Sequence, residues 1–258
     1  MKRLATTLGL LALAAFIASP AFAVSLLADG FAYPNGNLVP NGGWANYSGV
    51  ATDLQVVGGR AEGFGPNAND DHILFAAQPT NGKTYACFQV RIPNPGGAPK
   101  AIYFAELKDG GATNLVSRVY VLPLETGGWT FGISYSSTNA TTAGVTPWTA
   151  PLNYDQDYTL VINYDPATST SNLWVNPFTE ASPSVANTGT SAPIAVSGFG
   201  LRQSATASTL PPSPPYVGDT DWGFSVDNLG VGTTFDDACN RATPTLKSTW
   251  GAVKGIYR

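Results

Sequence analysis

The chain has one histidine among its 258 residues, so any chemistry that needs a histidine must use that one. That histidine, His72, lies in the stretch NDDHILF. A serine triad would place it beside an exposed serine and an orienting acid, but no Gly-x-Ser-x-Gly motif is present. A zinc site usually needs several histidine or cysteine ligands, which this composition does not supply. We therefore predict that His72 starts a strand and has no catalytic or zinc-binding role.

Calcium is the better inorganic candidate, because it takes about six to eight oxygen ligands from carboxylates, amides and carbonyls. Two groups of side chains supply such oxygens. They are Asn69, Asp70 and Asp71 in one stretch, and Asp219 and Asp221 in another. The alternative is that these acids are solvated turn formers. No cofactor is required by any motif, and calcium is the one cofactor that the sequence suggests.

A sugar site needs an exposed flat aromatic ring beside planar hydrogen-bonding side chains. Trp174 fits this requirement because Asn172 and Asn176 lie two residues to either side of it. Trp148, in the loop TPWTAP, is a second candidate. The alternatives are structural, with Trp174 packed under a neighbouring loop and Trp148 fixing its own loop.

Two cysteines, Cys87 and Cys239, allow one intramolecular disulfide. It would close a long loop, worth about 4–5 kcal/mol if the gain comes from chain entropy. Export would permit its formation, and the alternative is two thiols. We predict the disulfide.

Export is predicted by the first 23 residues, MKRLATTLGLLALAAFIASPAFA. Lys2 and Arg3 precede an apolar run at 8–17, and a small-x-small cleavage site ends at Ala23. The run is shorter than the ~20 residues that a membrane span needs, although a retained anchor is the alternative. We predict a secreted or cell-surface protein, cleaved near Ala23, with no membrane span after cleavage.

Strand-type alternation recurs through the rest of the chain, and helical periodicity is nearly absent. Predicted strands lie at 53–59, 72–78, 84–92, 100–107, 114–124, 128–136, 157–165, 172–178, 193–203 and 222–235. In each, one apolar face indicates a sheet covered on one side, and two such sheets stack as a sandwich. A break of phase near Asp227 predicts a β-bulge.

The tail at 241–258 is basic and contains no acid. Trp250, Val253 and Tyr257 have helical spacing there, so we predict a short helical tail. A sorting or attachment signal is the alternative. The proline-rich stretch 209–219 is interpreted as a loop inside one domain. The predicted organisation is a signal peptide at 1–23, a β-sandwich at 24–240 and the tail at 241–258.

Four stretches together resemble a known family: DGFAYPNGNLVPNGGW (29–44), INYDPATSTSNLWVNP (162–177), FGLRQS (199–204) and SVDNLGVGTTFDDAC (225–239). They resemble secreted bacterial concanavalin A-like (lectin/glucanase, laminin-G-like) jelly-roll domains. The resemblance implies an all-β, two-sheet antiparallel sandwich, and some relatives hold calcium at a loop rim. Members bind sugars, bind proteins or hydrolyse glycans, so the fold does not fix the function.

The glycosidases of that fold carry Glu-x-Asp-x-x-Glu or Glu-x-Asp-x-Glu on one strand, which places two carboxyl groups about 5–5.5 Å apart. The glutamates of this chain are Glu62, Glu106, Glu125 and Glu180. None has an acid at that spacing, and the nearest approach is Glu106 with Asp109 at a turn. We therefore predict that the protein is not an enzyme.

Once Lys2 and Arg3 are removed, 11 basic residues stand against 17 acidic ones, a net charge of −6. This balance argues against nucleic acid as a partner. We predict a non-catalytic module that binds a carbohydrate or the extracellular matrix. The alternative is a structural or adhesive surface protein whose tail is a sorting or attachment signal. Less favoured is a polysaccharide-active enzyme with a different site. The sequence does not indicate an oligomeric state.

Overall fold

The computed structural model describes residues 25–49, 52–64, 69–136, 144–203, 218 and 220–239. The predicted signal peptide, the predicted helical tail at 241–258 and Asp219 lie outside these residues, as does all but Gly218 of the stretch 209–219. Within the described ranges no helix has the length and apolar character needed to cross a membrane.

The described residues form strands almost throughout. The strands are β1 (Ser25–Asp29), β2 (Gly36–Asn37), β3 (Ala45–Ser48), β4 (Gln55–Val57), β5 (Arg60–Phe64), β6 (Asp70–Leu74), β7 (Thr84–Arg91), β8 (Ile102–Lys108), β9 (Leu115–Pro123), β10 (Trp129–Ser136), β11 (Thr146–Pro147), β12 (Asp157–Asp165), β13 (Thr170–Val175), β14 (Val185–Thr188), β15 (Gly198–Arg202) and β16 (Gly223–Gly232). A 3₁₀ turn, η1 (Asn41–Gly43), and a short helix, α1 (Phe235–Cys239), are the helical elements described.

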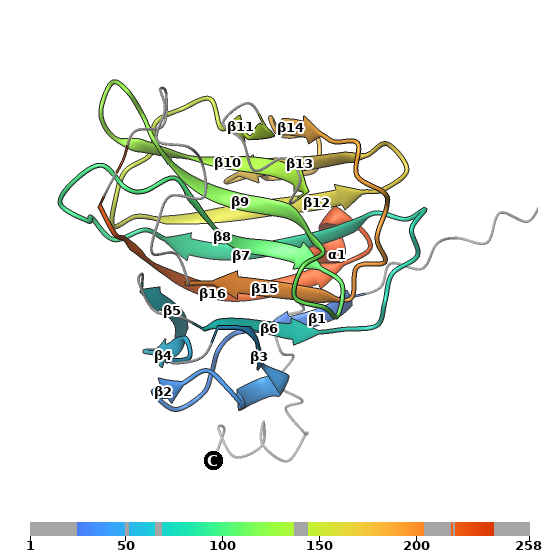
Figure 1. Cartoon of the computed structure of the whole chain (residues 1–258), viewed down its shortest axis with the longest axis horizontal. Helices are drawn as coiled ribbons and strands as arrows, with labels where there is room; N and C mark the ends of the chain where they lie inside the picture. Colours follow the sequence, from blue (N-terminus) through green and yellow to red (C-terminus); the bar gives the residue numbers. More distant parts are fainter. Residues whose placement is uncertain are drawn as a thin grey trace, which may run out of the picture.

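The strands form two antiparallel sheets, which overlie one another in Figure 1. Sheet A has the order β14-β13-β12-β7-β16-β5-β4-β2, and β1 also pairs with β16. Sheet B has the order β11-β10-β9-β8-β15-β6-β3. The predicted two-sheet antiparallel jelly-roll sandwich is therefore confirmed.

Alternation places the core between the sheets, as predicted. Along β10, Trp129, Phe131, Ile133 and Tyr135 are all fully buried in the main core. The predicted hairpin at 160–177 forms from β12 and β13, with Leu160 opposite Val175 in the register. Phe104 on β8 lies at the centre of the core. Its ring centroid is 6.5 Å from that of Phe88 and 5.3 Å from that of Phe224, which belong to sheet A. These aromatic contacts join the two sheets.

The predicted irregularity in β16 is also confirmed. The register of β16 against β7 shifts between Asp227 and Gly230, and Asn228 has a φ of 55°. Beyond this bulge, α1 lies directly on β16. A Cβ atom at Gly230 would lie 2.2 Å from the carbonyl oxygen of Ala238, so only glycine permits this approach.

Helix α1 covers part of the outer face of sheet A. It packs its apolar side on Tyr85, Val161 and Trp174. Cys87 belongs to this same cluster, and Cys239 at the end of α1 packs against it. The fold thus brings the two cysteines together, and their disulfide stays a prediction.

Truncating Phe104 to alanine should lower the free energy of unfolding by about 3–5 kcal/mol, because a buried ring that contacts both sheets is lost and a cavity remains. Phe178→Ala removes the same atoms from a side chain that is 97% exposed, so its effect should stay within about 0.5 kcal/mol. Urea unfolding of both variants measures the contrast. Equal losses would contradict the central role of Phe104.

Candidate functional site

The outer face of sheet B gathers charged and aromatic side chains from five strands. We call them the sheet-B cluster: Tyr47 (β3), Asp70 and His72 (β6), Tyr103, Glu106 and Lys108 (β8), Arg118 and Tyr120 (β9), and Arg202 (β15). Most of them are buried, although charged residues are almost never buried without a partner or a function. Tyr47, Tyr103 and Arg202 are part-exposed, so the cluster reaches the surface through them.

Glu106 is the central acid of the cluster and is fully buried. Its Oε1 accepts a hydrogen bond from the hydroxyl of Tyr47. Its Oε2 has no hydrogen-bond partner among the residues the structure describes. Burial raises the pKa of Glu106 to about 7, against the lowering effect of the Tyr47 hydrogen bond. The carboxyl group therefore titrates near neutral pH.

His72 and Lys108 form a second contact within the cluster. Lys108 Nζ lies 2.9 Å from His72 Nδ1 and 4.4 Å from the ring centroid of Tyr47. The ring of Tyr47 stacks on His72 at 5.2 Å. Burial, and secondarily the Lys108 charge, lowers the pKa of His72 to about 4. At neutral pH, Nδ1 of the uncharged imidazole accepts a hydrogen bond from the ammonium group.

Two arginines lie over one tyrosine ring. The guanidinium carbon of Arg118 is 4.8 Å from the Tyr103 ring centroid, and that of Arg202 is 4.5 Å away. Arg118 donates to the carbonyl of Ser136 at 2.6 Å, and Arg202 Nε lies 3.8 Å from an oxygen of Asp70. Arg118 Nε and Arg202 Nη1 are buried and have no partner within the described part of the chain. The two arginines make this edge of the cluster cationic, and each has a hydrogen-bond donor without a partner among the described residues.

Local irregularities explain how the strands place these groups. The register of β8 against β9 shifts between Tyr103 and Leu107, so Tyr103 and Glu106 share a face although they are three residues apart. On β15, a Cβ atom at Gly200 would lie 2.3 Å from Glu106 Oε1. The glycine therefore leaves the space that the Glu106 carboxyl group occupies.

Trp174 lies on the predicted outward face of β13, but its expected exposure is wrong. The ring is 3% exposed, lies 5.8 Å from Phe235 of α1, and donates Nε1 to the carbonyl of Glu180 at 3.2 Å. Asn172 donates to Asn163 Oδ1, and Asn176 Oδ1 accepts from the amide of Thr159 at 2.8 Å. The structure thus favours the structural alternative for Trp174.

Trp148 lies just after β11 and is part-exposed. Its carbonyl accepts a hydrogen bond from Thr130 Oγ1, and its amide donates to the carbonyl of Phe131. These contacts hold the backbone of the loop at the edge of sheet B. The ligand-binding role of its ring stays a prediction.

Of the five calcium candidates, Asp219 lies outside the described residues, and the other four have different partners. Asp70 points into the sheet-B cluster, whereas Asp71, its neighbour on β6, accepts from the amide of Leu54 at 3.0 Å. Asp221 pairs with Lys100 at 2.6 Å. Among the described residues no group of three or more His, Cys, Asp or Glu side chains is placed to hold a metal ion.

Asn69 and Asp71 nevertheless keep features that calcium would use. Each has a buried Oδ1 atom without a hydrogen bond of normal geometry in the described ranges. Asn69 Nδ2 donates to Asp53 Oδ1 at 2.8 Å, which brings a further carboxylate close. Burial raises the pKa of Asp71 to about 6. These oxygens fit a hard cation, so calcium binding at Asn69 and Asp71 stays a prediction.

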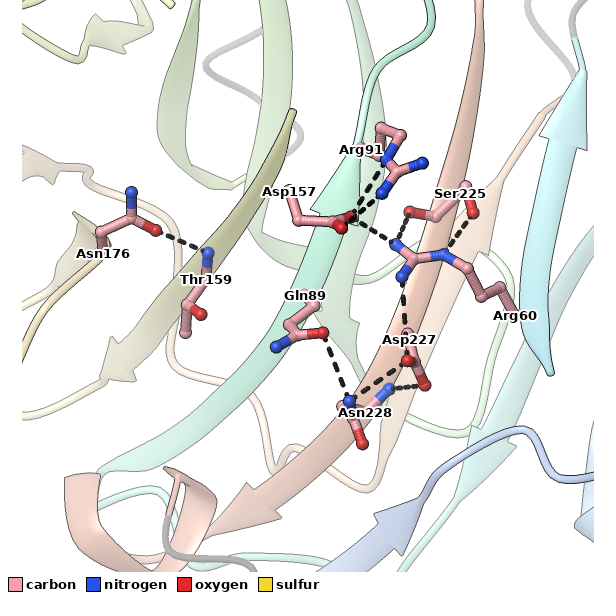
Figure 2. Close-up of polar contacts among 9 residues, drawn as sticks. All are labelled: Arg60, Gln89, Arg91, Asp157, Thr159, Asn176, Ser225, Asp227 and Asn228. Carbon is pink, nitrogen blue, oxygen red and sulfur yellow. Dashed lines mark hydrogen bonds and ion pairs between the residues drawn. The ribbon is translucent and has the colours of Figure 1, made fainter. Parts of the chain in front are cut away.

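The outer face of sheet A carries a different polar arrangement, in which charges are matched (Figure 2). Asp157 accepts from Arg60 at 3.0 Å and from Arg91 at 2.5 Å. The Arg91 hydrogen bond lowers the pKa of Asp157, against the raising effect of burial. Arg60 also lies 3.7 Å from Asp227. The arginines of sheet A are therefore paired with carboxylates, whereas Arg118 of sheet B contacts tyrosine rings and a backbone carbonyl.

From the sequence, His72 was considered alone and Glu106 only with Asp109, and Tyr47, Arg118 and Arg202 were missed. A usable signal was present, since Glu106-x-Lys108 and Arg118-x-Tyr120 put polar residues at alternate positions of apolar strands. In a chain with only 12% charged residues, such pairs inside strands are informative. Their assembly across strands needed the sheet order.

No protein-family model and no curated protein matches the chain. Solved structures share its fold at low identity. The CBM2 module of the Lactobacillus casei BL23 phage J-1 evolved Dit is 10% identical, with a TM-score of 0.52 over 82% of this chain and 96% of that one. An endo-1,3-beta-glucanase from Streptomyces sioyaensis is 11% identical, with a TM-score of 0.50 over 83% of this chain and 98% of that one. The botulinum neurotoxin serotype D/C binding domain is 8% identical, with a TM-score of 0.51 over 83% of this chain and 50% of that one. These likenesses show the sandwich fold.

The buried carboxyl group of Glu106 should make stability depend on pH. Its pKa is about 7 in the folded protein, whereas the ordinary pKa of a glutamate, which applies in the unfolded chain, is 4.5. The folded protein therefore binds the extra proton, and the free energy of unfolding falls as pH rises through this window. Glu106→Gln should gain about 1–3 kcal/mol relative to the parent protein as pH rises from about 5 to about 8, measured by urea unfolding.

Glu125→Gln makes the same chemical change at an exposed turn position and serves as the control. Its unfolding free energy should follow that of the parent protein at every pH. A constant offset between Glu106→Gln and the parent protein would show that Glu106 does not titrate in this range.

Proposed function

We propose that the protein binds a polysaccharide that carries carboxylate groups, and that it does so across the sheet-B cluster. The observation that carries the proposal is the pair of arginines over Tyr103, each with a guanidinium nitrogen that lacks a partner among the described residues. A guanidinium group pairs with a carboxylate through parallel hydrogen bonds. A tyrosine ring offers an apolar face for the sugar.

The charges of the cluster support an anionic ligand. Arg118, Arg202 and Lys108 are cationic, while Asp70 and Glu106 are the acids. Because the pKa of Glu106 is raised to about 7, a substantial fraction of this group is uncharged near neutral pH. The face then carries a net positive charge within a protein whose net charge is negative. A carboxylate of the ligand would pair with the guanidinium of Arg202, which is part-exposed. The signal peptide expected at 1–23 would place this activity outside the cell.

Binding to polygalacturonate, compared with its methyl-esterified form, tests the proposal because the two polymers differ in charge and share the sugar. Isothermal titration calorimetry should detect binding of the acidic polymer and little or no binding of the esterified polymer. Arg202→Gln should weaken binding at least about tenfold, since one charge-assisted contact is worth roughly 1.5–3 kcal/mol. Added salt should weaken it further.

Arg91→Gln removes a guanidinium from the outer face of sheet A and is the matched control. Its binding to polygalacturonate should equal that of the parent protein. If both polymers bind equally, or neither binds, the proposal fails. The second result would favour the structural or adhesive alternative.

A second candidate function is eliminative cleavage of the bound acidic glycan. It is favoured by the hydrogen-bonded pair of Tyr47 and Glu106 beside His72, all on the face that holds the arginines. A base would remove the proton next to the sugar carboxylate. The carbon–oxygen bond to the neighbouring sugar would break, a carbon–carbon double bond would form, and the leaving oxygen would take up a proton. The arginines would stabilise the negative charge that develops on the carboxylate.

Incubation with polygalacturonate distinguishes cleavage from binding, because the unsaturated product absorbs ultraviolet light. Cleavage by the parent protein, with binding retained and cleavage lost in Tyr47→Phe, would support this second function. Binding without any unsaturated product would leave the protein as the non-catalytic module expected from its sequence.

A further inference from the structure

A groove on the outer face of sheet A has the features of a second ligand site. The cavity measures about 340 Å³ and lies between the end of β13, the bulge of β16 and α1. Its walls include Gln89, Thr159, Phe178, Asn228 and Asp236. It is on the opposite side of the sandwich from the sheet-B cluster, and it shares no residue with it.

Phe178 is the first reason to consider this groove a binding site. Its side chain is 97% exposed, which is unusual for a large apolar residue at the edge of a cavity. The backbone is fixed, because Ser182 Oγ accepts from the amides of Phe178 and Thr179 at 3.1 and 3.2 Å. The backbone that carries the exposed ring is thus tethered beside the groove.

Unpartnered polar atoms are the second reason. Asn228 Nδ2 donates to Gln89 Oε1 at 3.3 Å, which aligns the two amides (Figure 2). Gln89 Nε2, Asn228 Oδ1 and Thr159 Oγ1 make no hydrogen bond to any described residue. All three residues are part-exposed and line the groove. The groove therefore offers a donor, an acceptor and a hydroxyl at once.

The backbone is shaped to present these groups. Asn176 and Asn228 have φ values of 51° and 55°, in the left-handed region, which asparagine adopts more readily than most residues other than glycine. Asn176 precedes the turn that carries Phe178, and Asn228 occupies the bulge of β16. Bulges re-aim side chains and are frequent beside functional sites. Figure 2 shows Asn176 beside Thr159 and Asn228 beside Gln89, and both of those partners line the groove.

The charges nearby select the ligand class. Arg60 and Arg91 are matched by Asp157 and Asp227, so they leave no cation for an anionic group. Asp236 at the wall disfavours a carboxylate and accepts hydrogen bonds from hydroxyl groups. We infer that the groove binds a neutral pyranose unit, stacked on Phe178 and hydrogen-bonded by its hydroxyls to Gln89, Thr159 and Asn228. The site is independent of the acidic-glycan proposal.

The test titrates the mature protein with cellohexaose, laminarihexaose and mannohexaose, three neutral probes. At least one should shift the side-chain amide NMR signals of Gln89 and Asn228 at millimolar concentration. Phe178→Ala should weaken that binding about tenfold, as expected for an aromatic anchor. Phe178→Tyr should retain it. Phe64→Ala, at a 44% exposed ring on β5, is the matched control and should bind like the parent protein.

The inference is overturned if none of the three probes shifts the two amide signals, or if Phe178→Ala binds as tightly as the parent protein. Phe178 is exposed, so loss of folding would not confuse the result. Arg202→Gln should leave neutral-sugar binding unchanged. Polygalacturonate titrations of the same samples then separate failure at this groove from failure at sheet B.

Discussion

The aromatic contacts around Phe104 hold the two sheets together, and the rest of the structure depends on this burial. Because side chains alternate along a strand, each strand that sends apolar residues between the sheets must send its other residues outward. Sheet A covers part of its outer face with α1, which packs on Trp174 and Tyr85. Sheet B places the charged and aromatic sheet-B cluster on its own outer face. The packing of the core thus determines where function can be located.

Burying charge on sheet B lowers stability unless the groups have partners. Glu106 has Tyr47, and Lys108 has His72, yet Glu106 Oε2 and Arg202 Nη1 stay without a partner in the described ranges. A sandwich that served only as a scaffold would be more stable with apolar or small residues at these positions. Shifted pKa values together with unpartnered atoms on one face are typical of functional sites. These features support the proposed ligand site at the sheet-B cluster.

Much of the fold could be predicted from the sequence, because alternation and turn chemistry are local signals. The β12–β13 hairpin and the bulge near Asp227 are confirmed in this way. The site could not be predicted, since its members come from strands far apart in sequence, such as Tyr47 and Arg202. Trp174 shows the same limit: its outward direction was predictable, but the cover provided by Phe235 was not. The irregular register of β8 also hid the shared face of Tyr103 and Glu106.

The two faces differ in how far carboxylates cancel the charge of their arginines, and this difference gives the sandwich its chemical polarity. On sheet A, Arg60 and Arg91 share Asp157, and Arg60 also lies near Asp227, so two carboxylates match the two arginines. On sheet B, Arg118 stacks on tyrosine and donates to a backbone carbonyl, so its charge is not cancelled by a carboxylate partner in the described structure. An anionic ligand would therefore gain more favourable electrostatic energy at sheet B than at sheet A. A neutral ligand at sheet A would not need to displace the paired carboxylates.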